Sequence, residues 1–148
     1  MSKIIIVEGV GINDLSLCGP HYYWSPEKND SICTPEYKMW YEMIRRSFSE
    51  KLKVFTSSTE KSTCSEEWLQ RYNFKLWYDE QGHYKDSSGK LLCLDKDILV
   101  PGNKEYGPDT CALVPHYINV VMKDLSGINK KSDLPLWCYY QNPTKDMI

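Results

Sequence analysis

The chain has 148 residues, and its 41% hydrophobic and 13% aromatic content excludes a disordered protein, which could not bury enough apolar surface to fold. Its formal net charge of −2 excludes general phosphate neutralisation as a mode of DNA binding, so contact with DNA would need a local basic patch. No apolar run approaches the roughly eighteen residues of a membrane span. We therefore expect a single domain over residues 1–148, with no membrane span, that acts in the cytoplasm.

The first half of the chain predicts one strand, a loop and a helix. Residues 4–7 are apolar and predict a strand, and turn-forming pairs across residues 14–34 predict a loop insert. A helix is expected to begin after Thr34, because Thr suits an N-cap and Pro35 suits the first helical turn. Aromatic and apolar residues then recur with helical spacing on one face, which predicts a core-facing helix. These residues are Tyr37, Trp40, Tyr41, Ile44 and Phe48.

The end of this helix holds the densest basic cluster in the chain. Arginine is suited to bidentate contact with phosphates and bases, so the cluster is a candidate DNA-binding site. The alternative is a solvated helix end, where cations are favoured by the helix dipole. The cluster consists of Arg45, Arg46, Lys51 and Lys53.

A second helix is expected from about Ser65 to Tyr78, followed by a polar, turn-rich segment over residues 79–90. The six cysteines are widely spaced and form no closely spaced pair of the kind typical of structural zinc. We expect them to be free thiols that act as small hydrophobic residues. A zinc site that includes Cys18 and His21 is the alternative.

Residues 91–124 have the pattern of two short strands joined by a loop and followed by a helix. The first strand is expected to end near Asp95, and Pro115 is expected to open the helix. The loop between the strands is rich in turn residues. The polar side chains of this unit are Asp95, Lys96, Asp97, His116 and Asn119.

This layout resembles the HNH (ββα-metal) endonuclease superfamily, and more closely its short phage-encoded members with a degenerate motif. The resemblance extends over most of the chain through three further segments: 9–17, 37–49 and 66–80. It implies a small α+β domain in which two helices pack on a ββα unit over about residues 91–124. It also implies action on DNA by divalent-metal-dependent cleavage of phosphodiester bonds.

The resemblance assigns metal ligands to two positions, and the strand pattern adds a third candidate. Asp95 matches the first metal ligand of the family, and Asn119 matches the ligand on the helix. Asp97 lies two residues after Asp95 and is a further candidate, because alternate residues of a strand share a face. Oxygen ligands of this kind suit Mg²⁺ or another divalent metal, which is the implied cofactor.

The catalytic positions depart from the family pattern. Lys96 stands where the family has its catalytic His, and Thr110 stands where it has an Asn. A lysine has an ordinary pKa near 10.4, and two flanking carboxylates favour its charged form, so Lys96 suits a phosphate contact better than proton abstraction. His116, one helical turn before the Asn ligand, is the alternative general base.

Two interpretations of function stay open. The first is a DNA endonuclease of the phage HNH type, with Lys96 and His116 in the catalytic roles. The second is a catalytically inactive HNH-like protein, which would bind DNA through the basic cluster or inhibit a host defence protein.

Overall fold

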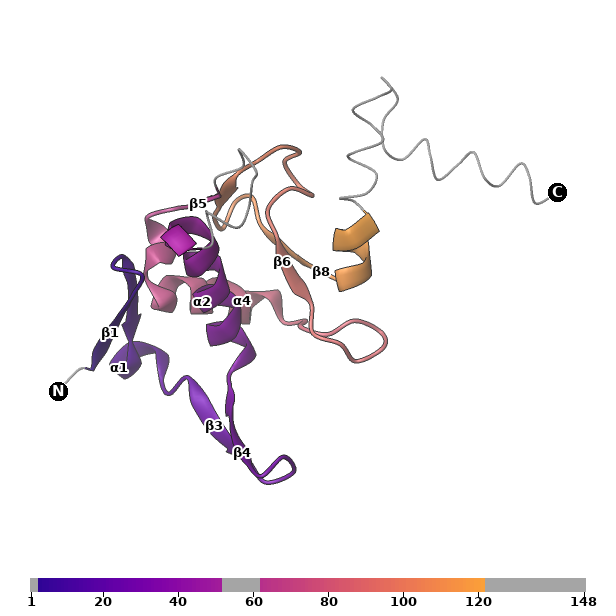
Figure 1. The fold of residues 1–148 in the computed structure, drawn as a ribbon. Helices are drawn as coiled ribbons and strands as arrows, with labels where there is room; N and C mark the ends of the chain where they lie inside the picture. The colour runs from indigo at the N-terminus through magenta and orange to yellow at the C-terminus, as the bar shows by residue number, and fades with distance from the viewer. Residues whose placement is uncertain (1–2, 52–61, 122–148) are drawn as a thin grey trace, which may run out of the picture.

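The computed structural model describes residues 3–51 and 62–121, which form short strand pairs around helices (Figure 1). This mixture confirms the α+β class. The elements are β1 (Ile4–Val7), β2 (Gly11–Asp14), α1 (Leu15–Cys18), β3 (Tyr22–Ser25), β4 (Asp30–Cys33), α2 (Pro35–Phe48), β5 (Thr63–Cys64), the 3-10 helix η1 (Glu67–Leu69), α4 (Arg71–Gln81), β6 (Cys93–Asp95), β7 (Glu105–Tyr106) and β8 (Ala112–Val114). Residues 116–121 are also helical.

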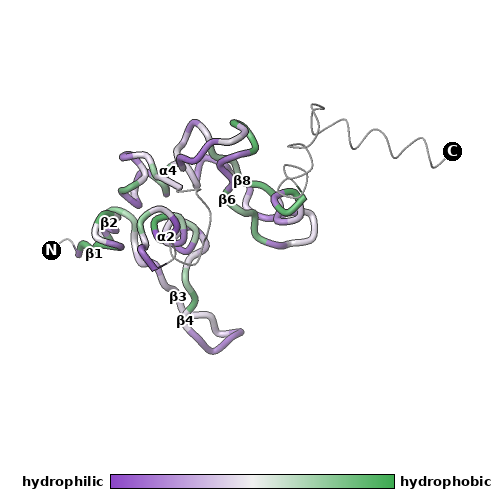
Figure 2. The backbone as a smooth tube through the Cα atoms, turned by 45° about the horizontal axis from the view of Figure 1, so that its top comes forward, coloured by the Kyte–Doolittle hydropathy of each residue, from purple (hydrophilic) through white to green (hydrophobic). Residues whose placement is uncertain are grey.

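The strands pair in twos. Antiparallel pairs form between β1 and β2, between β3 and β4, and between β6 and β8, while β5 and β7 pair in parallel. Figure 2 looks along α2 and places β1–β2, α4, β6–β8 and β3–β4 on different sides of that helix. The helix α2 is therefore the centre around which the other elements pack.

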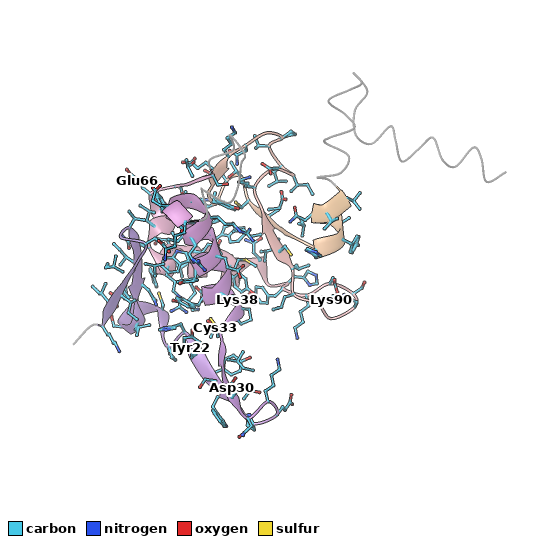
Figure 3. All side chains as sticks on the ribbon, viewed as in Figure 1. Tyr22, Asp30, Cys33, Lys38, Glu66 and Lys90 are labelled. Carbon is cyan, nitrogen blue, oxygen red and sulfur yellow. The ribbon has the colours of Figure 1, made fainter. Side chains whose placement is uncertain are left out.

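Residues 14–34 were expected to form a loop insert, and this expectation is wrong. The segment folds into α1 and the hairpin β3–β4, with Tyr22 at one end of the pairing opposite Cys33 and Ser25 at the other opposite Asp30. Figure 3 places Tyr22 and Cys33 near the body of the molecule and Asp30 farther out. The turn residues are present, but they close a hairpin because the aromatic run before them has high strand propensity.

The helix α2 matches the sequence prediction. It begins at Pro35, and Thr34 holds the N-cap position without a side-chain capping hydrogen bond. Tyr37, Trp40 and Ile44 are buried, as their spacing predicts. In the part of the chain that the structure describes, no helix is long and apolar enough to cross a membrane.

The second expected helix begins later than predicted. Instead of one helix from Ser65, the chain forms β5 and η1 before α4 begins at Arg71. Gln70 is extended and bridges to Ile12 of β2, so a tertiary contact interrupts the helical pattern. The helix α4 continues to Gln81, and Gly82 ends it with a left-handed φ of 65°, a conformation that glycine adopts without steric cost.

The core lies between α2, α4 and the β1–β2 hairpin, and the ββα unit joins it along one side. The indole N–H of Trp40 donates to the main-chain oxygen of Trp68 at 2.8 Å, which ties the centre of α2 to η1. Tyr106 and Cys111 bring the later strands into the same cluster. The cluster consists of Val7, Tyr37, Trp40, Met43, Ile44, Trp68, Phe74, Tyr78, Tyr106 and Cys111.

Candidate functional site

The ββα unit has the expected order of elements. Asp95 at the end of β6 pairs with Ala112 of β8, and Cys93 at the start of β6 pairs with Val114. The helical residues 116–121 follow directly after Pro115. The part of the expected unit beyond residue 121 lies outside the described residues.

Asp95 is buried and shapes the loop that follows β6. Its Oδ1 accepts the main-chain N–H groups of Asp97 at 2.8 Å and Ile98 at 2.7 Å. This is a common turn-forming role for an aspartate. The two bonds use Oδ1 and leave Oδ2 as the oxygen through which Asp95 could reach a metal.

Lys96 is held by its neighbours in the same loop. Its Nζ lies 3.2 and 3.3 Å from the two carboxylate oxygens of Asp97 and 5.6 Å from the ring centroid of Tyr106. An ion pair and a cation–π contact both favour a positive charge at this position. Lys96 is therefore placed as a cation, and Asp97 serves as its counter-ion.

His116 lies at the other end of the strand pair. Its Nδ1 is 3.7 Å from Sγ of Cys93, and the His116 side chain is exposed. Cys93 and Asp95 are two strand residues apart, about 7 Å along β6. His116 thus contacts the end of β6 that is remote from Asp95.

Asn119 is half-buried, and its main-chain N–H donates to the Pro115 oxygen at 3.3 Å. Its side-chain oxygen and Oδ2 of Asp95 are the candidate metal ligands that the resemblance supplies. Among the described residues, no group of three or more His, Cys, Asp or Glu side chains is placed to hold a metal ion. A cation at this unit would need water or phosphate oxygens to complete its coordination.

The basic cluster at the end of α2 presents fewer free cations in the described structure than the sequence suggests. Arg45 is half-exposed, with its Nε 3.7 Å from Oε1 of Glu8 and its guanidinium 5.7 Å from the ring centroid of Tyr41. Arg46 and Lys51 are exposed. Lys53 lies outside the described residues.

The polar centre of the N-terminal half is a buried ion pair that the sequence did not identify. Arg71 is 1% exposed, and its Nη2 donates to Oε2 of Glu36 at 2.7 Å. The Nη1 of Arg71 donates to Oδ1 of Asn13 at 3.0 Å and to the main-chain oxygen of Gly19 at 3.3 Å. No sequence signal links Glu36, in the first turn of α2, to a residue in α4.

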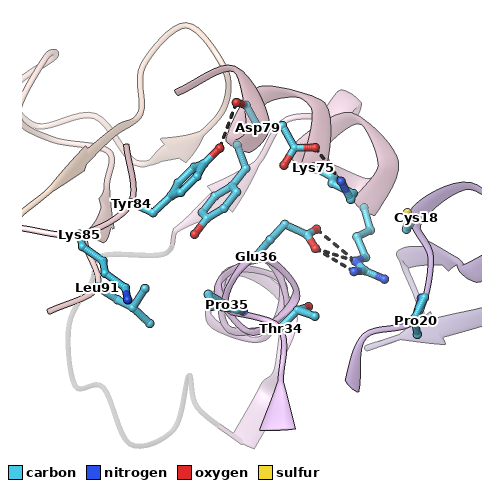
Figure 4. A pocket seen from close by; sticks show the side chains of 12 residues that line it. Cys18, Pro20, Thr34, Pro35, Glu36, Lys75, Asp79, Tyr84, Lys85 and Leu91 are labelled. Carbon is cyan, nitrogen blue, oxygen red and sulfur yellow. Dashed lines mark hydrogen bonds and ion pairs between the residues drawn. The ribbon is translucent and has the colours of Figure 1, made fainter. Parts of the chain in front are cut away.

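An open pocket of about 350 Å³ lies over this pair (Figure 4). The rings of Tyr78 and Tyr84 stack at 4.5 Å on one wall, and burial raises the pKa of Tyr78 to about 12. Lys75 pairs with Asp79 at 2.6 Å, so this cation and the buried Arg71 each have a carboxylate partner. These charged groups pair with one another, which indicates a structural role.

No family model, curated protein sequence or solved structure matches the chain. Membership of the HNH superfamily thus stays a prediction from the motif.

Proposed function

We propose that this chain is a phage-type HNH-like protein that binds DNA and uses its ββα unit as a scaffold. The observation that carries the proposal is the internal use of the two residues nearest the expected catalytic centre. Asp95 holds the loop by two hydrogen bonds, and Lys96 is fixed between Asp97 and Tyr106. Lys96, which stands where the family has its catalytic base, is held as a cation and is not placed to activate water.

DNA contact would come from the exposed cations at the end of α2. Arg46 and Lys51 face solvent, and the one carboxylate that pairs with Arg45 among the described residues is the exposed Glu8. Exposed pairs of this kind contribute about 0–1 kcal/mol, so a phosphate can replace Glu8 at little cost. Such binding is local, which fits a chain whose net charge is slightly negative.

The test is fluorescence anisotropy of a labelled DNA duplex titrated with protein in EDTA at several salt concentrations. The double variant Arg46→Ala/Lys51→Ala should weaken binding and reduce the salt slope by about 2, because two phosphate contacts are removed. Lys90→Ala, which removes an exposed cation on the segment after α4, is the matched control and should bind as the unmodified protein does. An absence of duplex binding at low salt would contradict the proposal.

Metal-dependent DNA cleavage is the second candidate, favoured by the order of β6, a connection that contains β7, then β8 and helical residues 116–121. In this alternative Asp95 and Asn119 hold Mg²⁺ or another divalent metal. Lys96 contacts phosphate, and His116 acts as the base.

Supercoiled plasmid incubated with Mg²⁺, Mn²⁺ or EDTA separates the two candidates. Asp95→Asn keeps an oxygen acceptor for the two loop N–H groups but removes the negative charge with which Asp95 would attract a divalent cation. Metal-dependent nicking that is lost in Asp95→Asn would establish the nuclease. If the folded protein nicks no DNA with either metal, the ββα unit is better described as a scaffold without nuclease activity.

A further inference from the structure

The hairpin β3–β4 projects from the body of the molecule (Figure 1) and carries three consecutive exposed aromatic residues. Tyr22, Tyr23 and Trp24 are 53%, 49% and 59% exposed. Aromatic side chains bury large apolar areas in folded proteins, so three of them on one projecting strand suggest a binding surface.

The base of the hairpin is fixed to α2. The N–H of Thr34 donates to the His21 oxygen at 2.9 Å, and the His21 ring lies 4.5 Å from the ring of Tyr37. The Tyr22 ring lies 6.5 Å from the same ring of Tyr37. The exposed aromatics therefore stand on a support that is anchored in the core.

The strand register places the aromatics on two faces, because successive side chains of a strand point in opposite directions. Tyr22 and Trp24 share one face, and Tyr23 lies on the other with Asp30, the only acidic residue of the two strands. The Tyr22–Trp24 face consists of Tyr22, Trp24, Ser31 and Cys33.

A cation lies at the base of the Tyr22–Trp24 face. Lys38 of α2 is exposed and close to Cys33 (Figure 3). Burial raises the pKa of the Cys33 thiol. The positive charge of Lys38 opposes this rise and is the strongest charge effect on the thiol, which is consistent with its position near Cys33. Asp30 is turned to the opposite face and accepts the N–H of Ser31 at 2.7 Å. The face thus combines two aromatic rings with a positive charge at its base, and its strands contribute no acidic residue. Glu36 and Glu42 of α2 also act on the Cys33 thiol, but more weakly than Lys38.

We propose that the Tyr22–Trp24 face binds single-stranded DNA, with one base stacked on each ring and Lys38 in contact with the phosphate backbone. The two residues are about 7 Å apart along β3, which leaves room for a separate base on each ring of an extended strand. Stacking on aromatic residues beside a cation is how proteins bind unpaired bases without sequence preference. The inference rests on the proposed DNA binding and specifies the unpaired strand as what the hairpin recognises.

The test measures anisotropy of a labelled oligo-dT of about twelve nucleotides, a length within the site sizes of such surfaces. Trp24→Ala and Tyr22→Ala should each weaken binding about 5- to 150-fold, the effect of losing one stacked base. Tyr23→Ala is the matched control, because it removes an equally exposed aromatic from the opposite face and should leave affinity unchanged. The logarithm of the affinity should fall with the logarithm of salt concentration with a slope of roughly −0.7, as one phosphate contact predicts.

Four results would overturn the inference. Equal binding of oligo-dT by the unmodified protein, Trp24→Ala and Tyr22→Ala, with duplex binding intact, would remove the hairpin from DNA recognition and leave the proposed function standing. Failure to bind either oligo-dT or duplex would overturn both proposals. Tighter binding of oligo-U than of oligo-dT would assign the face to RNA. Concentration-dependent dimerisation that Trp24→Ala abolishes would assign the face to a second copy of the chain. Trp24 has no ring contact among the described residues, so unchanged thermal unfolding is expected for Trp24→Ala. Tyr22→Ala removes a ring near His21 and Tyr37, and its unfolding curve checks that this variant is folded.

Discussion

Replacing Arg71 by Met should strongly destabilise the protein, because it removes the counter-charge of a buried carboxylate. The guanidinium contacts both oxygens of Glu36 at 2.7 to 3.3 Å and also bonds Asn13 and Gly19. Glu36 is 6% exposed, so little water reaches its carboxylate in the folded protein to replace these contacts. Breaking one side of a buried ion pair costs about 3–5 kcal/mol, a large part of the roughly 5–15 kcal/mol that stabilises a typical domain.

The destabilisation should depend on pH. Burial raises the pKa of Glu36, and the hydrogen bonds and charge of Arg71 oppose that rise, so the pKa rises further in Arg71→Met. A carboxyl whose pKa is higher in the folded state binds more protons when folded, and its contribution to stability falls as pH rises through that window. The deficit of the variant relative to the unmodified protein should therefore shrink as pH falls from 7 towards the ordinary Glu pKa of 4.5.

Urea denaturation followed by the fluorescence of buried Trp40 and Trp68 measures this deficit at each pH. The double variant Arg71→Met/Glu36→Leu removes both charges and should recover most of the lost stability. A deficit for Arg71→Met below about 1 kcal/mol, the range of exposed pairs, would refute the reasoning. So would a deficit that stays constant between neutral and acidic pH.

Three further predictions concern packing and thiol chemistry. Gly11→Ala should lower the free energy of unfolding, measured by urea denaturation, by about 1–3 kcal/mol, because the new Cβ would lie 3.1 Å from the Trp40 ring. Gly107→Ala is the control and should lower it less, because the nearest atom to its new Cβ lies at 3.5 Å. Trp40→Phe should lower the free energy of unfolding by about 1–3 kcal/mol in the same assay, because the main-chain oxygen of Trp68 in η1 loses its hydrogen-bond donor. An unchanged unfolding midpoint would argue against that hydrogen bond. Burial raises the pKa of Cys64 to about 12 and that of Cys111 to about 11, so roughly 10⁻⁴ and 10⁻³ of these thiols are ionised at pH 8. Mass spectrometry after alkylation should find both thiols much slower to react in the native protein than in urea. Equal rates would contradict the shielding of the half-buried Cys64 and the buried Cys111.

The sequence predicted those elements whose signals are local. The helix α2 begins at Pro35 because a turn signal and an apolar face agree there, and β6, β8 and the helical residues after Pro115 also lie where the pattern placed them. The start of α4 was missed because Gln70 pairs with a strand far away in sequence. A contact of that kind overrides local helix propensity and leaves no signature in its own segment.

The candidate site could be predicted in composition but not in geometry. Asp95 and Lys96 were identified as the polar residues of the loop, yet their contacts depend on how the loop folds. Asn103 sets part of that fold by donating to the main-chain oxygens of Lys96 at 2.9 Å and Glu105 at 2.7 Å. Similarly, Glu36 and Arg71 meet only through tertiary packing, so neither spacing nor charge pattern could have joined them.

The two proposed DNA contacts are connected by α2, and this connection predicts how they act together. Lys38 lies near the start of the helix and Arg45 near its end, seven residues or about 10 Å apart along the axis and within roughly 20° of the same side. A rigid helix of this length holds the hairpin and the basic end within reach of one DNA molecule. A duplex with a single-stranded overhang should therefore bind more tightly than the duplex or oligo-dT alone, because the second contact becomes intramolecular. Trp24→Ala should reduce the affinity for the overhang substrate towards that for plain duplex, because one of the two stacking rings is lost. Anisotropy titrations of the three DNAs would show this. Equal affinities of the unmodified protein for duplex with and without the overhang would mean that the two surfaces act separately.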